Sequence, residues 1–151
     1  MDACYWDSSA ILKFYVEEDD SAEYKHLMGN RPEAEEICVG FLHETELYYA
    51  FQKKELDGQL DVGMAKELFG LFQSHIDNHK LQYIPWSRRV AEESRKVLDT
   101  CLSVTPPPLV RSLDGLHLAT MQSEGIRKLA TADKRMKEAG ELLGFEVLSP
   151  A

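Results

Sequence analysis

The sequence predicts an α/β fold, a three-layer sandwich in which helices cover both faces of a central, parallel, five-stranded sheet. Two observations support this prediction. Five short apolar or β-rich runs alternate with longer segments of helical period, and such alternation is typical of parallel sheets covered by helices. The 151 residues also fit a single domain, 1–151, which is large enough to bury a core without disulfides or a structural metal.

The first half of the chain is predicted to form two strands, each followed by a helix. The run over 3–6 is the first strand, and residues 8–16 have helical spacing. The acidic residues 17–20 form a solvated loop. A second strand over 36–41 then leads into a helix over 44–56.

The segment after this helix is longer than a plain crossover requires. The turn signal at Asp57-Gly58 is followed by residues 62–79, which carry apolar side chains at helical spacing. We therefore expect a helical hairpin that projects from the sheet. Residues 106–108 are three prolines, which force an extended loop. The remaining elements alternate as strand 81–84, helices 87–102 and 113–124, strand 128–130, helix 134–143 and strand 145–148.

Composition restricts the environment and the partners of the chain. Acidic residues outnumber basic ones by 26 to 17, so the formal net charge is −9 and a local basic patch or a metal must hold any phosphate-bearing substrate. Cys4, Cys38 and Cys101 form no C-x-x-C pair, which favours buried thiols in a reducing cytoplasm. No run approaches the roughly 20 apolar residues of a membrane span, and the N-terminus lacks the pattern of a signal peptide. We expect a soluble, cytoplasmic protein.

Four carboxylates, Asp7, Glu46, Asp114 and Asp133, lie just after predicted strands or at the starts of the helices that follow. The carboxyl ends of parallel strands lie along one edge of a sheet, so these distant residues are expected to meet there. Four acids at one edge repel each other unless a cation lies between them. A hard divalent metal such as Mg²⁺ prefers oxygen ligands of this kind.

Helix capping is the alternative explanation for single members of this set. Asp7 and Asp133 each precede a predicted helix, where an Asp readily accepts hydrogen bonds from free backbone amides. A charge at Asp114 is favoured by the helix dipole. Glu46 borders an apolar stripe, where an ionised Glu is costly unless it is paired or bound to metal. Capping does not explain an acid at the end of strand after strand, so the shared site is the better interpretation.

Several motifs around these acids resemble those of PIN domains, in particular VapC-like toxin ribonucleases. They are Asp7-Ser8-Ser9-Ala10-Ile11-Leu12-Lys13, Glu46-Leu47, Leu113-Asp114-Gly115-Leu116-His117-Leu118-Ala119-Thr120 and Thr131-Ala132-Asp133. The resemblance spans the whole chain, and the helix with Asp114 and the Thr-x-Asp are its most specific parts. It implies a PIN-like fold and a metal-dependent endoribonuclease that hydrolyses RNA, as the toxin of a type II toxin–antitoxin pair.

The resemblance also implies roles for individual residues. Asp7, Glu46, Asp114 and Asp133 would be the catalytic acids and would bind Mg²⁺ or Mn²⁺, with Asp7 and Asp114 in direct contact. Ser8 would lie near the metal, and the hydroxyl of Thr131 would orient a carboxylate or a water molecule. The implied partners are an RNA substrate, a cognate antitoxin protein and a second copy of the chain in a homodimer.

Basic and aromatic residues are candidates for contacts with these partners. Lys13, Arg111 and Lys134 lie near the acids in sequence and could guide an RNA strand, although each could equally be a solvated charge. Exposed aromatic side chains on the helix over 44–56 would suit a protein partner; they are expected to be Tyr48, Tyr49 and Phe51.

Two other functional classes are the alternatives. An Asp-dependent phosphotransfer or phosphatase domain also places Asp at strand ends, but this chain has Asp7-Ser8-Ser9 in place of Asp-x-Asp and no Lys in its last strand. A non-catalytic PIN-fold interaction module is the other alternative, and the intact acids argue against it. His75 and His79 have the spacing of a zinc site but lack the Glu of a zinc protease, and His117 is expected to be a hydrogen-bonded structural residue.

Overall fold

The computed structural model describes residues 2–150, in which five strands form one parallel sheet in the order β3-β2-β1-β4-β5. The strands are β1 (Ala3–Trp6), β2 (Glu36–Gly40), β3 (Gln82–Ile84), β4 (Lys128–Ala130) and β5 (Glu146–Leu148). The chain thus starts in the middle of the sheet, builds outward through β2 and β3, and then crosses to the other side of β1. The predicted five-stranded parallel sheet is confirmed.

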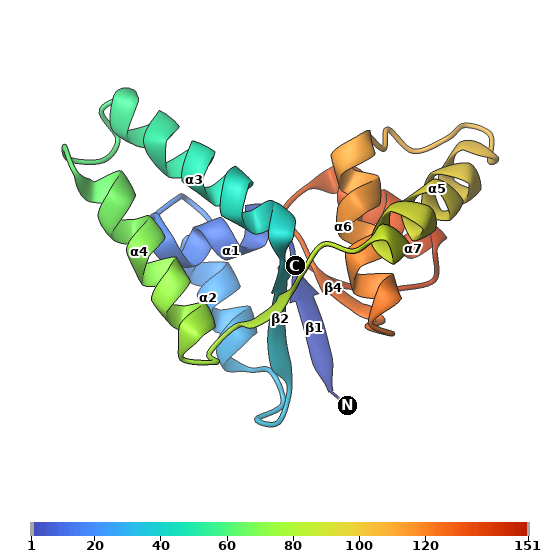
Figure 1. The fold of residues 1–151 in the computed structure, drawn as a ribbon, viewed down its shortest axis with the longest axis horizontal. Helices are drawn as coiled ribbons and strands as arrows, with labels where there is room; N and C mark the ends of the chain where they lie inside the picture. Colours follow the sequence, from blue (N-terminus) through green and yellow to red (C-terminus); the bar gives the residue numbers. More distant parts are fainter. Residues whose placement is uncertain (1, 151) are drawn as a thin grey trace.

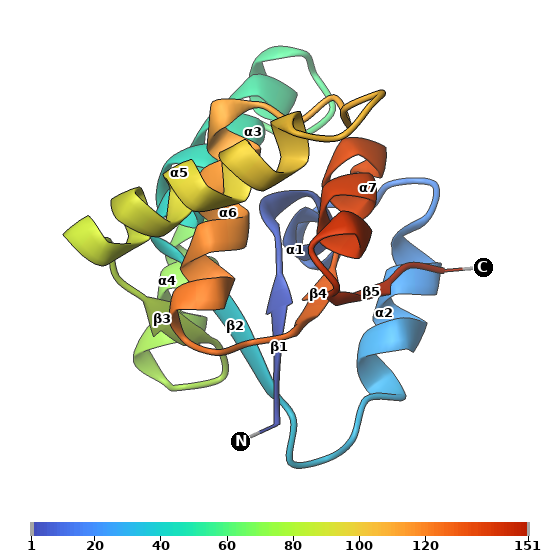
Figure 2. The ribbon, with the colours of Figure 1, turned by 90° about the vertical axis from the view of Figure 1, so that its right-hand side faces the viewer.

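Helices cover both faces of this sheet. One face carries α1 (Ser8–Tyr15), α2 (Ser21–Gly29), α3 (Phe41–Leu56) and α4 (Met64–Asp77), and the other carries α5 (Arg88–Leu102), α6 (Ser112–Ser123) and α7 (Lys134–Leu142). Figure 1 shows the first group on the left of the sheet and the second on the right. In Figure 2, which faces the second group, α5, α6 and α7 lie in front of the strands. The predicted three-layer sandwich is therefore confirmed.

Alternation along the strands divides the core into two parts. In β1, Cys4 and Trp6 pack with α1 to α4, whereas Tyr5 between them packs with α5 to α7. All three side chains are fully buried. Because successive side chains of a strand point to opposite faces, a strand covered on both faces must be apolar throughout. The short apolar runs in the sequence have this physical origin.

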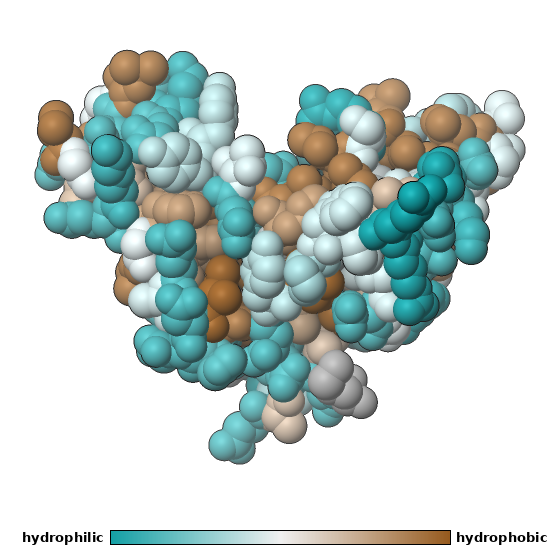
Figure 3. Space-filling view, viewed as in Figure 1, coloured by the Kyte–Doolittle hydropathy of each residue, from teal (hydrophilic) through white to brown (hydrophobic). Residues whose placement is uncertain are grey.

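The predicted helical hairpin consists of α3 and α4. The two helices pack against each other and project beyond the sheet, as Figure 1 shows. Phe51 and Phe72 are fully buried in the core beneath them. The expectation that Phe51 is exposed is therefore wrong, because its face of α3 packs on the core, whereas Tyr48 and Tyr49 are exposed. Figure 3 shows a notch between this hairpin and the helices of the other face.

The structure contains one helix that the sequence did not predict, and several element boundaries differ from the prediction by one to three residues. Helix α2 was not predicted, because only Ser21 and Tyr24 of its nine residues are buried and it has no continuous apolar stripe. Helix α3 begins at Phe41, directly after β2, three residues earlier than expected. The consequence is that Glu46 lies in the second turn of α3 and not in its first.

The three cysteines are buried free thiols, in agreement with the expectation. Burial raises the pKa of Cys38 to about 12, and it raises the pKa of Cys4 further, so both thiols are protonated and unreactive at neutral pH. Between residues 2 and 150, none of the helices has the length and apolar composition needed to cross a membrane.

Candidate active site

The four acids line a single cavity of about 320 Å³ at the carboxyl edge of the sheet. Asp7 follows β1 and Asp133 follows β4, and each caps the next helix. Glu46 lies in α3, which continues β2, and Asp114 lies in the first turn of α6. The parallel topology therefore brings together residues separated by most of the chain, at the edge of the sheet where β2 leads into α3 (Figure 1).

Asp7 is the most tightly held of the four acids, and it is only 3% exposed. Its Oδ1 accepts hydrogen bonds from the backbone N–H of Ala10 at 3.0 Å and from the Ser9 hydroxyl at 2.7 Å. Its Oδ2 accepts one from the Thr131 hydroxyl at 2.5 Å. Burial raises the pKa of Asp7 above its usual value despite these donors, so its ionised form is costly without a cation nearby.

Thr131 connects Asp7 to Asp133. The oxygen of its hydroxyl also accepts a hydrogen bond from the backbone N–H of Asp133 at 3.0 Å. The Asp133 carboxylate accepts from the backbone N–H of Arg135 at 2.8 Å and from its guanidinium at 3.4 Å. Burial acts to raise the pKa of Asp133, but the hydrogen bonds and charge of Arg135 outweigh it and hold the pKa below its usual value. Asp133 is therefore ionised at neutral pH.

Asp114 is 7% exposed and is also a helix-capping residue. Its Oδ2 accepts a hydrogen bond from the backbone N–H of Arg111 at 2.9 Å, while its Oδ1 accepts none from residues 2–150. Like Asp7 and Asp133, it combines a capping contact with a place in the cavity wall. Capping and a shared site, which the sequence presented as alternatives, therefore occur together.

Two side chains donate hydrogen bonds to the same carboxylate oxygen of Glu46. Its Oε1 accepts hydrogen bonds from the Ser8 hydroxyl at 2.8 Å and from Nε2 of His117 at 2.5 Å. Burial acts to raise the pKa of Glu46, but the contacts with His117 and Ser8 outweigh it, so the pKa lies below its usual value. Glu46 is consequently an anion at neutral pH, and Ser8 contacts it directly.

His117 lines the cavity together with the acids, a role that sequence analysis did not assign to it. It lies three residues after Asp114 on α6, and residues at this spacing share a face of a helix. Its other ring nitrogen, Nδ1, is 2.6 Å from the hydroxyl oxygen of Tyr5 in β1. The spacing from Asp114 was the sequence signal, but only the position of α3 reveals the contact with Glu46.

Gly40, the residue between β2 and α3, allows these elements to approach one another. A Cβ at this position would lie 2.9 Å from Cγ2 of Thr120 and 3.2 Å from the Tyr5 hydroxyl. The first distance is shorter than real Cβ contacts, so the absence of a side chain lets the start of α3 lie against α6. The distance between Glu46 and His117 depends on this packing.

The three candidate basic residues have different environments. Arg111 lines the cavity, with its backbone bonded to Asp114. Lys13 does not line it, because its ammonium group pairs with Glu18 at 3.1 Å and Asp20 at 2.7 Å. Lys134 is exposed at the start of α7 and is likewise absent from the cavity wall. The structure therefore brings only Arg111 into contact with the cavity.

The acids line one cavity but do not converge on a single point. Within residues 2–150, no three His, Cys, Asp or Glu side chains lie close enough together to coordinate one ion. The wall nevertheless offers carboxylate oxygens without hydrogen-bond donors from these residues, Oε2 of Glu46 and Oδ1 of Asp114. Such oxygens are the donors that hard divalent cations prefer.

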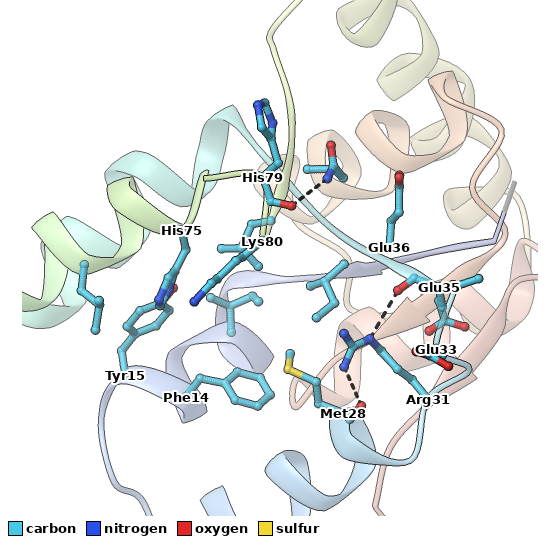
Figure 4. A pocket seen from close by; sticks show the side chains of 16 residues that line it. Phe14, Tyr15, Met28, Arg31, Glu33, Glu35, Glu36, His75, His79 and Lys80 are labelled. Carbon is cyan, nitrogen blue, oxygen red and sulfur yellow. Dashed lines mark hydrogen bonds between the residues drawn. The ribbon is translucent and has the colours of Figure 1, made fainter. Parts of the chain in front are cut away.

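A second, larger cavity of about 600 Å³ lies among α1, α2, α4 and the first residues of β2 and β3. Its wall combines apolar side chains such as Phe14 and Met28 with charged ones such as Arg31 and Lys80, as Figure 4 shows. Arg31 donates there to the backbone carbonyls of Met28 and Glu35. His75 bonds to Tyr15, and His79 lies beyond the end of α4 with a positive φ of 59°. None of the four acids lines this cavity.

Comparison with known proteins defines the class of protein. A family model of the PIN domain matches residues 4–142, and the chain belongs to the PIN domain family. Ribonuclease VapC46 of Mycobacterium tuberculosis strain H37Rv is 31% identical over 154 aligned residues, which cover 100% of both chains. Ribonuclease VapC35 of the same species is 41% identical over 58 residues, which cover 36% of this chain and 43% of that protein.

Solved structures share the fold over nearly the full chain. VapC20 of M. tuberculosis, a toxin that cleaves the sarcin-ricin loop, superposes with a TM-score of 0.68 at 13% identity, covering 97% of this chain and 99% of that one. VapBC2 from Rickettsia felis, bound to a promoter DNA fragment, has a TM-score of 0.68 at 14% identity and coverages of 98% and 99%. These similarities confirm the PIN-like fold.

Proposed function

We propose that the protein is a metal-dependent endoribonuclease that hydrolyses RNA phosphodiester bonds and acts as the toxin of a type II toxin–antitoxin pair. The observation that carries this proposal is the placement of Asp7, Glu46, Asp114 and Asp133 around one cavity at the carboxyl edge of the sheet. The full-length similarity to Ribonuclease VapC46 supports RNA as the substrate. Parallel α/β sheets bind their ligands at this edge.

The chemistry of the cavity wall fits Mg²⁺ or Mn²⁺. Its titratable groups other than His117 and Arg111 are carboxylates, and Glu46 and Asp114 each have an oxygen that accepts no hydrogen bond within residues 2–150. Because no three acids converge on one point, each bound ion would be held directly by one or two carboxylates, with water and phosphate oxygens completing its shell. Mg²⁺ is usually bound to proteins in this way. When bound, the metal supplies charge neutralisation for the phosphate and activation of water.

The individual residues have distinct tasks in this proposal. Asp7 and Asp114 would contact the metal directly, and Glu46 and Asp133 would contact it directly, through water or through a second ion. Thr131 orients Asp7 with its hydroxyl, and Ser8 orients Glu46. Hydrogen-bonded partners behind metal ligands fix their orientation in this manner.

Substrate binding in this proposal depends mainly on Arg111. It lines the cavity, and it forms no ion pair within the described residues, so its guanidinium is available to a phosphate. Lys134 lies at the start of α7, where it could contact a strand that leaves the cavity. Lys13 pairs with Glu18 and Asp20, which offset its charge, so we assign it no contact with RNA.

The proposed protein partners are an antitoxin and a second copy of the chain. Tyr48 and Tyr49 are 42% and 62% exposed on α3, where a partner could cover them. A basic antitoxin side chain could also pair with the acids and block the cavity. Solved proteins with this fold include a toxin–antitoxin complex from Klebsiella pneumoniae, with a TM-score of 0.64 at 14% identity and 98% coverage of each chain.

Cleavage of mixed RNA with Mg²⁺, with Mn²⁺ or with a chelator tests the activity directly. We expect cleavage only with metal, and loss of cleavage in single Asn or Gln variants of the four acids. Glu67, an exposed acid on α4 outside the cavity, provides the matched control as Glu67→Gln. Full activity in the chelator, or in all four acid variants, would refute the proposal and favour a non-catalytic interaction module.

A further inference from the structure

One oxygen of the Glu46 carboxylate is fixed by the protein and the other is not. Oε1 accepts hydrogen bonds from Nε2 of His117 at 2.5 Å and from Ser8 at 2.8 Å. Oε2 accepts none from residues 2–150. The side chain of Glu46 is 32% exposed and that of His117 is 4% exposed, so the imidazole lies behind the carboxylate as seen from solvent.

The two hydrogen-bond partners of His117, Tyr5 and Glu46, establish which of its nitrogens donates. The hydroxyl oxygen of Tyr5 is 2.6 Å from Nδ1 and is completely buried beneath α6. A phenol keeps its proton at neutral pH and can both donate and accept a hydrogen bond. The carboxylate of Glu46 only accepts, so Nε2 of His117 is the donor to it, and in the neutral imidazole Nδ1 then accepts from the Tyr5 hydroxyl. Nε2–H therefore points to Glu46.

Packing holds the His117 ring in this orientation. The ring of His43 lies edge-on to it, with centroids 5.2 Å apart, and the ring of Tyr5 lies 5.8 Å away. His43 is itself immobilised, because Nδ1 accepts from the backbone N–H of Gly40 and Nε2 donates to the carbonyl of Trp6. The imidazole of His117 thus has neighbours on its face and partners at both nitrogens.

We infer that His117 is a positioning residue for Glu46, held by Tyr5 so that its Nε2–H fixes Oε1 and presents Oε2 to the bound cation. This inference rests on the proposed function. The structure does not favour His117 as a direct metal ligand, because both of its ring nitrogens already form hydrogen bonds with protein groups. Partners of this kind, one step behind a metal ligand, typically contribute about 10- to 100-fold to metal affinity or activity.

Two substitutions separate the hydrogen bond from the volume of the side chain. His117→Leu keeps an apolar side chain in the same space but removes the donor. His117→Gln places an amide N–H near the position of Nε2 and keeps a donor for Glu46. The readout is Mn²⁺ affinity of the intact protein without RNA, measured by calorimetry. We expect His117→Leu to weaken binding by roughly tenfold or more, and His117→Gln to recover most of that loss.

The chain contains a matched control for this measurement. The hydroxyl of Tyr15 lies 2.6 Å from Nδ1 of His75, the same pair of atoms at the same distance as in Tyr5 and His117. Figure 4 shows this second pair in the wall of the larger cavity, which none of the four acids lines. His75→Leu and Tyr15→Phe should leave Mn²⁺ affinity unchanged, whereas Tyr5→Phe should weaken it in the same direction as His117→Leu.

A double substitution tests whether His117 acts through Glu46. In the Glu46→Gln background, His117→Leu should cause no further loss of Mn²⁺ affinity, because the carboxylate that it positions is gone. An additive loss would overturn the inference. So would a His117→Leu protein with parental circular dichroism and parental Mn²⁺ affinity.

The remaining outcomes distinguish the inference from the proposed function. If His117→Leu does not fold, Tyr5→Phe decides, and parental Mn²⁺ affinity in that variant would overturn the inference. If the parent protein itself neither binds Mn²⁺ nor cleaves RNA, the proposed function fails and the inference fails with it. If the parent does both while the His117 and Tyr5 variants match it, the inference alone fails.

Discussion

The hydroxyl of Thr131 donates a hydrogen bond to Oδ2 of Asp7 across 2.5 Å, although 124 residues separate the two in sequence. It joins the carboxyl ends of β1 and β4, which are adjacent in the sheet. The same hydroxyl oxygen accepts a hydrogen bond from the backbone N–H of Asp133. One side chain therefore contacts two of the acidic residues that line the cavity. The Thr-x-Asp motif at the end of β4 therefore has a structural explanation.

Replacement of Thr131 should affect the site more than the fold. Thr131→Val keeps the shape of the side chain but removes the donor to Asp7, and we expect Mn²⁺ affinity to fall by roughly 10- to 100-fold. Thr131→Ser keeps the hydroxyl and should remain close to the parent. Calorimetric Mn²⁺ titration of both variants measures this difference, and equal affinity in the two would contradict the role given to the hydroxyl.

Asp7→Asn should not destabilise the metal-free protein. Burial raises the pKa of Asp7, so its ionised form is unfavourable in the folded state at neutral pH, and the amide removes that cost while it can still cap α1. We expect a melting temperature equal to or above that of the parent without metal. Addition of Mg²⁺ or Mn²⁺ should stabilise the parent but not Asp7→Asn. Thermal unfolding with and without metal provides the measurement, and equal metal stabilisation of both proteins would be the contrary result.

His43 should make stability depend on pH. Burial lowers its pKa from 6.5 to about 3 in the folded protein, with His117 as a further cause. Between these two values the unfolded chain binds more protons, so stability falls as pH decreases from about 6.5 towards 3. The slope expected from one such group is about 1.4 kcal/mol per pH unit.

Urea denaturation between pH 7 and pH 5 measures this slope. His43→Gln should flatten it, because the substituted side chain does not titrate in this range. His26→Gln is the control, since His26 is exposed on α2 and should leave the slope unchanged. An unaltered slope in His43→Gln would show that other groups cause the dependence.

RNA affinity should depend on metal more strongly than on salt. The net charge of −9 leaves few local cations to displace counterions from RNA. We would measure binding of a model RNA to Asp133→Asn, which retains three of the acids, in titrations with Mg²⁺ and with NaCl. Arg111→Ala should weaken this binding further. A steep salt dependence without any effect of Mg²⁺ would instead reveal a basic groove outside the cavity.

Expression in a bacterium tests the toxin proposal. Without the neighbouring gene, the parent should arrest growth, because RNA cleavage would be unopposed. Asp114→Asn should be harmless at the same protein level, and co-expression of the neighbour should protect cells from the parent. Harmless expression of both forms would favour a standalone nuclease or a binding module.

The alternation of apolar runs and helical segments was sufficient to predict the central sheet, the two helical layers and the hairpin. These features follow from local periodicity and from topological rules for parallel strands, which a single sequence reveals. The same rules placed Asp7, Glu46, Asp114 and Asp133 at one edge, because the carboxyl ends of parallel strands coincide. Helix α2 was missed since it lacks an apolar stripe.

Only the tertiary structure determined which side chains meet. The contact of His117 with Glu46 requires α3 and α6 to lie together at the carboxyl edge of the sheet, and no local pattern specifies that distance. Likewise, Lys13 pairs with Glu18 and Asp20 because the loop after α1 folds back towards it. Residue type and spacing therefore determined the acids and their common edge, whereas the packing of distant elements decided how each acid is held.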